Sequence, residues 1–177
     1  MACDITAGRL EPCKNTIGGL RNVYFLNFNK DAFTIVDGEV TAFDVSVTQA
    51  FRYELKADGN NYEEGFSSDK NTGVTLFTPT ISLVLKKQDL QTNNEIKLLA
   101  WGRPHVIVED RMGNYRVAGH TEGADVTGGS IVTGGAKSDF NGYNITMVAE
   151  EVEPAPFLSA EAITALQAIV VEGAPPA

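Results

Sequence analysis

The chain has 177 residues and a mass of 19.0 kDa, a size that suits one domain and leaves little room for two. Its hydrophobic fraction of 43% and charged fraction of 21% are typical of a packed core and exclude wholesale disorder. The 14 Lys and Arg residues against 23 Asp and Glu residues give a formal net charge of −9. Such a chain lacks the clustered bases that clamp nucleic acid through its phosphates, although it can surround nucleic acid without gripping it.

The sequence predicts no membrane-spanning segment. The longest stretch without a charged residue runs from Asn71 to Leu85 and contains Pro79, whereas a spanning helix needs about 20 mostly apolar residues. Asp4 stands where a secretion signal would require a basic start and an apolar run, so we expect synthesis in the cytoplasm. In that reducing compartment we expect Cys3 and Cys13 to be small buried thiols, with a Cys3–Cys13 disulfide formed after release from the cell as the alternative.

Short antiparallel strands are predicted along most of the chain. Turn signals separate segments rich in Val, Ile, Phe, Tyr and Thr, and they lie at Asp37-Gly38, Asp58-Gly59, Met112-Gly113-Asn114 and Asn141-Gly142. Apolar and polar residues alternate over Phe43–Val47, Phe51–Ala57 and Ile81–Leu85, which indicates strands with one buried and one solvated face. Val106–Val108 and Tyr115–Ala118 predict a tight hairpin, and Asn144–Ala149 predicts a last strand.

One polar segment, Lys56–Thr72, predicts a long projecting hairpin whose turn is Asp58-Gly59-Asn60-Asn61. Tyr62 and Phe66 lie within it. A mobile loop is one interpretation, and a contact loop that orders on assembly is the other. Because exposed aromatic residues often mark interfaces, Tyr62 and Phe66 are candidate subunit-interface residues.

A helix is predicted from Thr92 to Trp101. Thr92-Asn93-Asn94-Glu95 fits a capping box, and Gly102 and Pro104 end the helix. Such a short helix is marginal alone, so we expect it to lie across an open end or face of the sheet.

A second helix is predicted from Ser159 to Glu172, behind a linker that contains Pro154 and Pro156. Its apolar stripe consists of Ile163, Leu166, Ile169 and Val170. The stripe needs a surface to cover it, either the parent sheet or an adjacent subunit. The reach of the linker favours the adjacent subunit, which makes Leu166 and Ile169 candidate interface residues; a disordered tail is the remaining alternative.

The sequence offers no constellation of catalytic, cofactor-binding or metal-binding residues. Its two histidines, His105 and His120, are expected to be structural. The glycine-rich segment before Ser138 fails as a phosphate-binding loop because Ala136 separates Gly135 from Lys137. We therefore expect no enzyme activity, no cofactor and no bound metal. A small-ligand-binding β-barrel or an enzyme of another kind would need a pocket with convergent polar groups.

Several short segments together carry a family resemblance, and in chain order they are Met1-Ala2-Cys3, Pro12-Cys13-Lys14, Gly18-Gly19-Leu20, Val23-Tyr24-Phe25, Tyr53-Glu54-Leu55-Lys56, Trp101-Gly102-Arg103-Pro104-His105-Val106, Gly123-Ala124-Asp125-Val126-Thr127-Gly128-Gly129 and Gly142-Tyr143-Asn144-Ile145-Thr146. Over roughly residues 1–157 the chain resembles virion structural proteins of tailed phages, and its organisation is similar to that of tail-tube (major tail) proteins. The helix after Pro156 departs from that family's pattern.

The resemblance implies a mainly β fold: an antiparallel β-sandwich or barrel of tail-tube type over residues 1–157 with an N-terminal arm and one flanking α-helix. The residues themselves add a C-terminal helical extension over residues 158–177. It also implies self-assembly into six-membered rings that stack into a hollow tube, with other tail proteins as further partners. DNA would pass through without specific binding, and no membrane partner is expected.

The leading hypothesis is therefore a structural subunit of a phage tail tube, located in the virion tail and in the host cytoplasm during assembly. Capsid decoration, a head-to-tail connector and the tube protein of a contractile injection system are the alternatives. Like charge keeps DNA from adhering to the wall, so a net negative or neutral lumen is expected.

Overall fold

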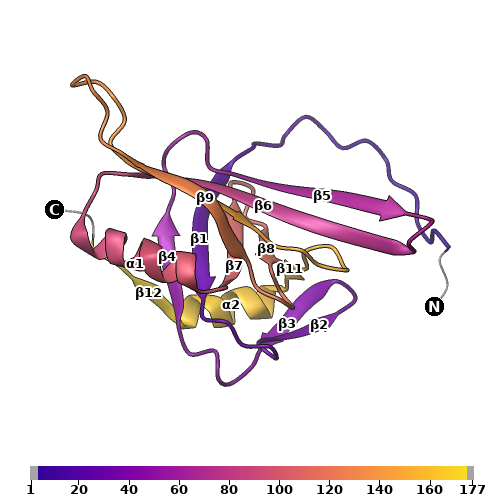
Figure 1. The fold of residues 1–177 in the computed structure, drawn as a ribbon. Coiled ribbons are helices and arrows are strands. Elements are labelled where there is room, and N and C mark those ends of the chain that lie inside the picture. The colour runs from indigo at the N-terminus through magenta and orange to yellow at the C-terminus, as the bar shows by residue number, and fades with distance from the viewer. Residues whose placement is uncertain (1–3, 175–177) are drawn as a thin grey trace.

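The computed structural model describes residues 4–174, which form twelve strands and two helices arranged around two sheets (Figure 1). In spatial order the eight-stranded sheet contains β12 (Val170–Glu172), β4 (Ala50–Glu54), β1 (Leu20–Leu26), β7 (His105–Asp110), β8 (Tyr115–Ala118), β11 (Phe157–Leu158), β3 (Glu39–Phe43) and β2 (Phe33–Val36). The four-stranded sheet contains β5 (Asn61–Asp69), β6 (Val74–Lys86), β10 (Gly142–Val148) and β9 (Asp125–Val132). The mainly β prediction is confirmed. Most neighbouring strands are antiparallel, but β11 pairs with β3 and β12 pairs with β4 in parallel.

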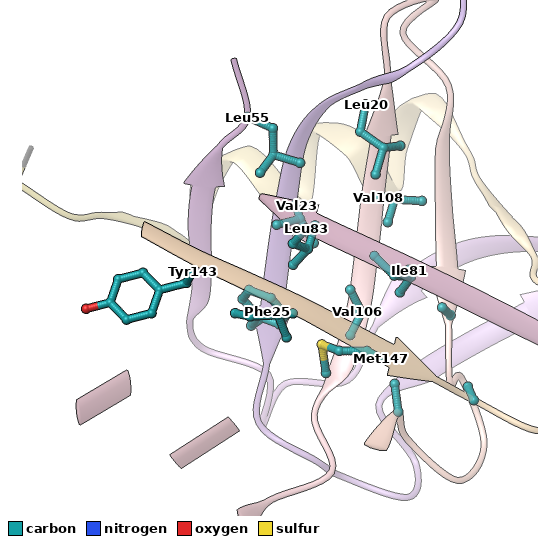
Figure 2. Close-up of a cluster of buried hydrophobic side chains, with 14 residues drawn as sticks. Leu20, Val23, Phe25, Leu55, Ile81, Leu83, Val106, Val108, Tyr143 and Met147 are labelled. Atoms are coloured by element: carbon teal, nitrogen blue, oxygen red, sulfur yellow. The ribbon is translucent and has the colours of Figure 1, made fainter. Parts of the chain in front are cut away.

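The two sheets share a core of apolar side chains. Val23 and Phe25 of β1 lie with Val106 of β7 on one side, and Ile81 of β6 and Met147 of β10 lie on the other (Figure 2). These residues occupy alternate positions of their strands, so each strand turns one apolar row to the partner sheet. The alternation predicted for Ile81–Leu85 is thus the inward face of β6.

A second core lies on the opposite face of the eight-stranded sheet. Tyr24, Leu26 and Ile107 project there from β1 and β7 and pack with Leu166 of α2 (Ala160–Ala168). The face is covered because α2 follows directly on β11, which is inserted between β8 and β3. The sheet is therefore apolar on both sides in its central strands.

The first helix, α1 (Leu90–Trp101), begins two residues before the predicted start. Its N-cap is Asp89, whose carboxylate accepts a hydrogen bond from the backbone N–H of Thr92 at 2.8 Å. Thr92 therefore lies inside the first turn and is not the cap, so the predicted capping box is wrong. Gly102 ends the helix as predicted. Ile96 and Leu99 pack against the core between the sheets, and α1 lies beside β9.

The second helix begins where predicted, because the Ser159 hydroxyl accepts a hydrogen bond from the N–H of Ala162 at 3.1 Å. It ends at Ala168 rather than Glu172, since Val170–Glu172 forms β12 beside β4. The prediction of one helix to Glu172 is therefore wrong at its end: pairing with a distant strand replaces the last helical turn. Residues 175–177 lie outside the described residues.

The predicted strand over Phe43–Val47 fails where a side chain caps a turn. Val45 is exposed in a turn after β3, because the Asp44 carboxylate accepts hydrogen bonds from the backbone N–H and the hydroxyl of Ser46. These hydrogen bonds also lower the pKa of Asp44.

The projecting hairpin exists, but its turn lies after Asp69, not at Asp58–Asn61. Gly73 adopts φ +70° there, and the Asp69 carboxylate accepts a hydrogen bond from the N–H of Asn71. At the base, the Asn60 side chain is buried: it donates to the carbonyl of Ala57 and accepts from the N–H of Val84. These contacts fix the hairpin to the body at the place where the sequence predicts its tip.

Candidate functional site

His105 is a structural residue. Its ring is completely buried, stacks on Phe28 at 5.1 Å and meets Phe33 edge-on at 4.9 Å. Nε2 lies 3.1 Å from the backbone nitrogen and 2.9 Å from the carbonyl oxygen of Asn29, and Nδ1 lies 2.6 Å from the carbonyl oxygen of Gly119. Both ring nitrogens are therefore occupied by the backbone, which leaves none for acid–base chemistry or a metal.

His120 lies beside a buried carboxylate. Its Nδ1 is 3.8 Å from Oε1 of Glu151, and that same oxygen accepts hydrogen bonds from the N–H groups of Thr121 and Glu122. The backbone of Glu151 pairs with Phe77 of β6, so the contact holds the β8–β9 loop against β6 within the projecting hairpin. The contact therefore connects two segments that are distant in the sequence.

A third polar cluster surrounds Glu109 of β7. The carboxylate oxygen Oε2 accepts hydrogen bonds from the side chain of Asn22 at 2.6 Å and from the hydroxyl of Tyr24 at 2.9 Å. The Gln167 side chain of α2 approaches the hydroxyls of Tyr24 and Tyr115. Burial raises the pKa of both tyrosines. The cluster satisfies polar groups buried under α2, which is a packing role.

Among residues 4–174 no group of three His, Cys, Asp or Glu side chains is placed to hold a metal ion. Neither helix in that range is long and apolar enough to cross a membrane. The features that remain unpartnered in the described part of the chain are surfaces. They are the hairpin tip, the N-terminal arm, the free edges of the four-stranded sheet and the outer side of α1.

The hairpin formed by β5 and β6 extends well beyond the eight-stranded sheet (Figure 1). Near its tip the ring of Phe66 is 76% exposed and lies 6.0 Å from the ring of Phe77 across the hairpin. Val74, at the tip but on the other face of the hairpin, is also exposed. The structure thus places Phe66 on an apolar surface that nothing in the described part of the chain covers.

Tyr62 has a different environment from Phe66. Its ring is half-buried against the core between the sheets, its hydroxyl donates to Glu64 at 2.8 Å, and the Arg116 guanidinium lies 5.8 Å from the ring centre. Burial, with the Glu64 carboxylate, raises the pKa of Tyr62. Tyr62 therefore anchors the base of the hairpin, and only part of its ring is exposed for contact with another subunit.

The two candidate residues of the C-terminal segment lie within the chain's own fold. Leu166 is 0% exposed, packed between α2 and the eight-stranded sheet, so it presents no surface to another subunit. Ile169 is partly buried against the same core, and its carbonyl accepts a hydrogen bond from Ala50. The stripe is covered by the parent sheet, which was the less favoured of the two sequence-based alternatives. The linker with Pro154 and Pro156 does not carry the C-terminal segment to another subunit, because β11 joins the sheet of its own chain immediately afterwards.

The four-stranded sheet has two free edges, β5 and β9. Its outward face is mostly polar: the cross-strand row Asn61, Ser82, Thr146 and Gly128 spans all four strands, and Leu76, Val84 and Val148 are apolar residues on the same face. Neighbouring rows of that face carry the acids Glu63, Asp69 and Asp125 and one base, Lys86. The face is therefore hydroxyl-rich with a small excess of negative charge.

The N-terminal arm before β1 lies outside both sheets (Figure 1). Ile5 and Leu10 are almost fully exposed, and Cys13 is an exposed free thiol. The expectation of a buried Cys13 is therefore wrong, since the arm has no core around it. Cys3 lies outside the described residues, and with it the alternative of a Cys3–Cys13 disulfide.

The total surface reflects these extensions. The chain exposes 11323 Å², whereas a folded monomer of 19.0 kDa exposes about 8,400 Å² by the usual scaling of surface with mass. The excess of about 2,900 Å² is larger than the surface that one subunit buries in a standard protein interface, about 800 Å².

The sequence indicated the exposed aromatic residue of the hairpin but not the sheet edges or the polar face. A signal for the face was present in Thr78, Thr80 and Ser82, which alternate with the apolar residues of β6. The sheet edges carry no local signal, because they depend on which strands pair. Comparison of the chain with protein-family models and with curated protein sequences gives no match.

Proposed function

We propose that the chain is a structural subunit of a phage tail tube, which assembles into stacked rings around a channel for the genome. The observation that supports the proposal best is the surface excess, because it leaves ample area for contacts with other copies of the chain. Its arm and its hairpin tip carry exposed apolar side chains, which in soluble proteins commonly mark contacts with other proteins. The proposed setting is the virion tail, with assembly in the host cytoplasm.

In this proposal the two sheets form a β-sandwich of tail-tube type, and the ring closes through the free edges of the four-stranded sheet. All pairs in the order β5-β6-β10-β9 are antiparallel, so the direction of the strands alternates. Because the number of strands is even, β9 of one subunit runs opposite to β5 of the next. Head-to-tail pairing of the two edges therefore continues the antiparallel pattern, removes both free edges and can close a ring.

The polar face would then line the channel. Serine, threonine and asparagine are more frequent on it than aliphatic residues, and Lys86 is outnumbered by Glu63, Asp69 and Asp125. DNA phosphates find few cations there, so the wall does not retain the genome. The hairpin tip, with Phe66, projects from the ring and supplies a contact to a neighbouring subunit or ring.

The edge contact can be tested with a pair of matched variants. Ile131 on β9 is 56% exposed, and Val36 on β2, an edge of the other sheet, is 53% exposed. Lysine on an edge strand blocks strand pairing between molecules. We expect Ile131→Lys to abolish assembly and Val36→Lys to leave it intact, both with unchanged monomer stability.

The measurement is sedimentation velocity of concentrated wild-type and variant protein, with electron microscopy of the fast-sedimenting fraction. Rings or tubes in the wild type and in Val36→Lys, with monomers in Ile131→Lys, support the proposal. A wild-type protein that stays monomeric at high concentration contradicts it, and so does an Ile131→Lys variant that assembles normally.

A further inference from the structure

The outer side of α1 is an apolar surface with no partner in the described part of the chain. Leu98 and Trp101 are three residues apart, so they share one side of the helix. Leu98 is 59% exposed and Trp101 is 75% exposed, and Leu90 adds a further exposed apolar side chain at the start of the helix. Ile96 and Leu99 connect α1 to the core, so the side that carries Leu98 and Trp101 is not needed to hold the helix on the sheets.

This surface lies on one flank of the molecule. α1 runs beside β9, the edge strand, and Gln88 just before the helix donates to the carbonyl of Val132 at 3.0 Å. α1 thus closes the side of the two-sheet core at β9.

A groove of about 340 Å³ lies on the opposite flank, beside β5. The residues before β1, the start of β5 and the β7–β8 turn form its walls, with Ile17, Tyr62, Glu64, Asp110 and Arg116 among the lining side chains. Tyr62 and the exposed Ile17 give it apolar surface.

The two flanks are chemically complementary. The lining carries two carboxylates, Glu64 and Asp110, against the single guanidinium of Arg116, and α1 carries Lys97 at 4.4 Å from the centre of the Trp101 ring. The Arg116 guanidinium, which lies 4.3 Å from the centre of the Phe157 ring, is a cation that a tryptophan ring in the groove would approach, and the Lys97 ammonium carries the charge opposite to that of the two carboxylates.

We propose that the exposed side of α1, formed by Leu98 and Trp101, docks into the groove beside β5 of a second copy of this chain. The occupant is a second copy because the two surfaces lie on opposite edges of the four-stranded sheet and cannot meet within one molecule. The inference rests on the proposed ring, in which β9 of one subunit lies next to β5 of the neighbour and brings the two flanks together. The contact is heterologous, so it repeats from subunit to subunit around a ring.

The area supports a second copy of this chain. The surface excess of about 2,900 Å² exceeds what one ring contact requires, about 800 Å² from each of two flanks. Strand pairing of β9 with β5 covers backbone edges, and the docking of α1 adds the apolar core that a stable interface needs.

Fluorescence of Trp101 is a direct readout, because it is the only tryptophan of the chain. Assembled and unassembled fractions of the same wild-type preparation are compared for emission maximum and for quenching by acrylamide. We expect a blue shift and a several-fold lower quenching constant on assembly. Assemblies whose Trp101 is quenched as readily as in the monomer overturn the inference while leaving the proposed function intact. Absence of any assembly contradicts the proposed function, and the inference with it.

A cysteine pair tests the partner surface. In a background of Cys3→Ser and Cys13→Ser, Leu98→Cys is combined with Ile17→Cys, and the control combines Val45→Cys with Ile17→Cys. All three positions are exposed, so folding is unaffected. We expect oxidation of the assembled Leu98→Cys, Ile17→Cys protein to give a ladder of covalent oligomers on a reducing-agent-free gel, and the control to give none. Shielded tryptophan without that ladder, or a ladder equally strong in the control, overturns the groove as the docking site.

Discussion

Replacing Leu166 by alanine tests whether α2 belongs to the core of the chain. Leu166 is 0% exposed and packs with Tyr24, Ile107 and Val117 beneath the helix. Truncation removes buried methyl groups and leaves a cavity, which costs about 2–5 kcal/mol at such sites. We expect a loss of about 3 kcal/mol in the free energy of unfolding. In a chain of this size that loss lowers Tm by about 6–12 °C.

The assay is urea unfolding of dilute, unassembled protein followed by far-ultraviolet circular dichroism. Leu98→Ala is the matched control, since it makes the same truncation on the exposed side of a helix, where substitutions change stability by less than about 0.5 kcal/mol. The two variants should separate: Leu166→Ala loses stability, and Leu98→Ala keeps stability but assembles poorly. Equal unfolding midpoints for the two variants would refute the packing of α2 on its own sheet.

Three further predictions concern the fold. Gly119→Ala should destabilise the protein far more than Gly38→Ala, as measured by thermal melts of the two variants. Both glycines have positive φ, but a Cβ at Gly119 would lie 2.3 Å from the carbonyl carbon of Gly123, whereas a Cβ at Gly38 would meet no other atom. His105→Leu should lower the free energy of unfolding in urea by about 1–3 kcal/mol, because it leaves buried backbone groups without a hydrogen-bond partner. Burial raises the pKa of Tyr53 from 10.0 to about 12, so the stability that its neutral hydroxyl contributes should be fully present below pH 10 and be lost between pH 10 and 12. Over that range the urea midpoint should fall less in Tyr53→Phe than in the wild type.

Local sequence patterns correctly predicted the elements in which buried and exposed residues alternate over a few positions. The alternation in β6 and the hairpin of β7 and β8 follow from side chains that point in turn to core and solvent. The predictions failed where a side chain competes for the backbone: Asp44 turns the chain after β3, and Asp89 caps α1. Both aspartates precede the backbone N–H group that they bind by two or three residues, a spacing that the sequence shows but does not distinguish from a solvated acid.

The candidate site depended mostly on contacts between distant parts of the chain. The exposed Phe66 was predicted from composition, since a polar hairpin has no core to bury an aromatic ring. Leu166 was not correctly placed, because its helical spacing fits any apolar surface equally well. Which strands become edges, and therefore where β5 and β9 lie, follows from the whole pairing order, which no local spacing encodes.

The central claim is that the chain assembles into rings through the edges of its four-stranded sheet. A cryo-electron microscopy reconstruction of the assembled wild-type protein tests it most directly. The account predicts that β9 of each subunit lies antiparallel to β5 of the next, and that Ser82, Thr146 and Glu63 face the bore, which is neutral or negative. A reconstruction in which these edges remain free, or in which lysine and arginine side chains dominate the bore, would contradict it.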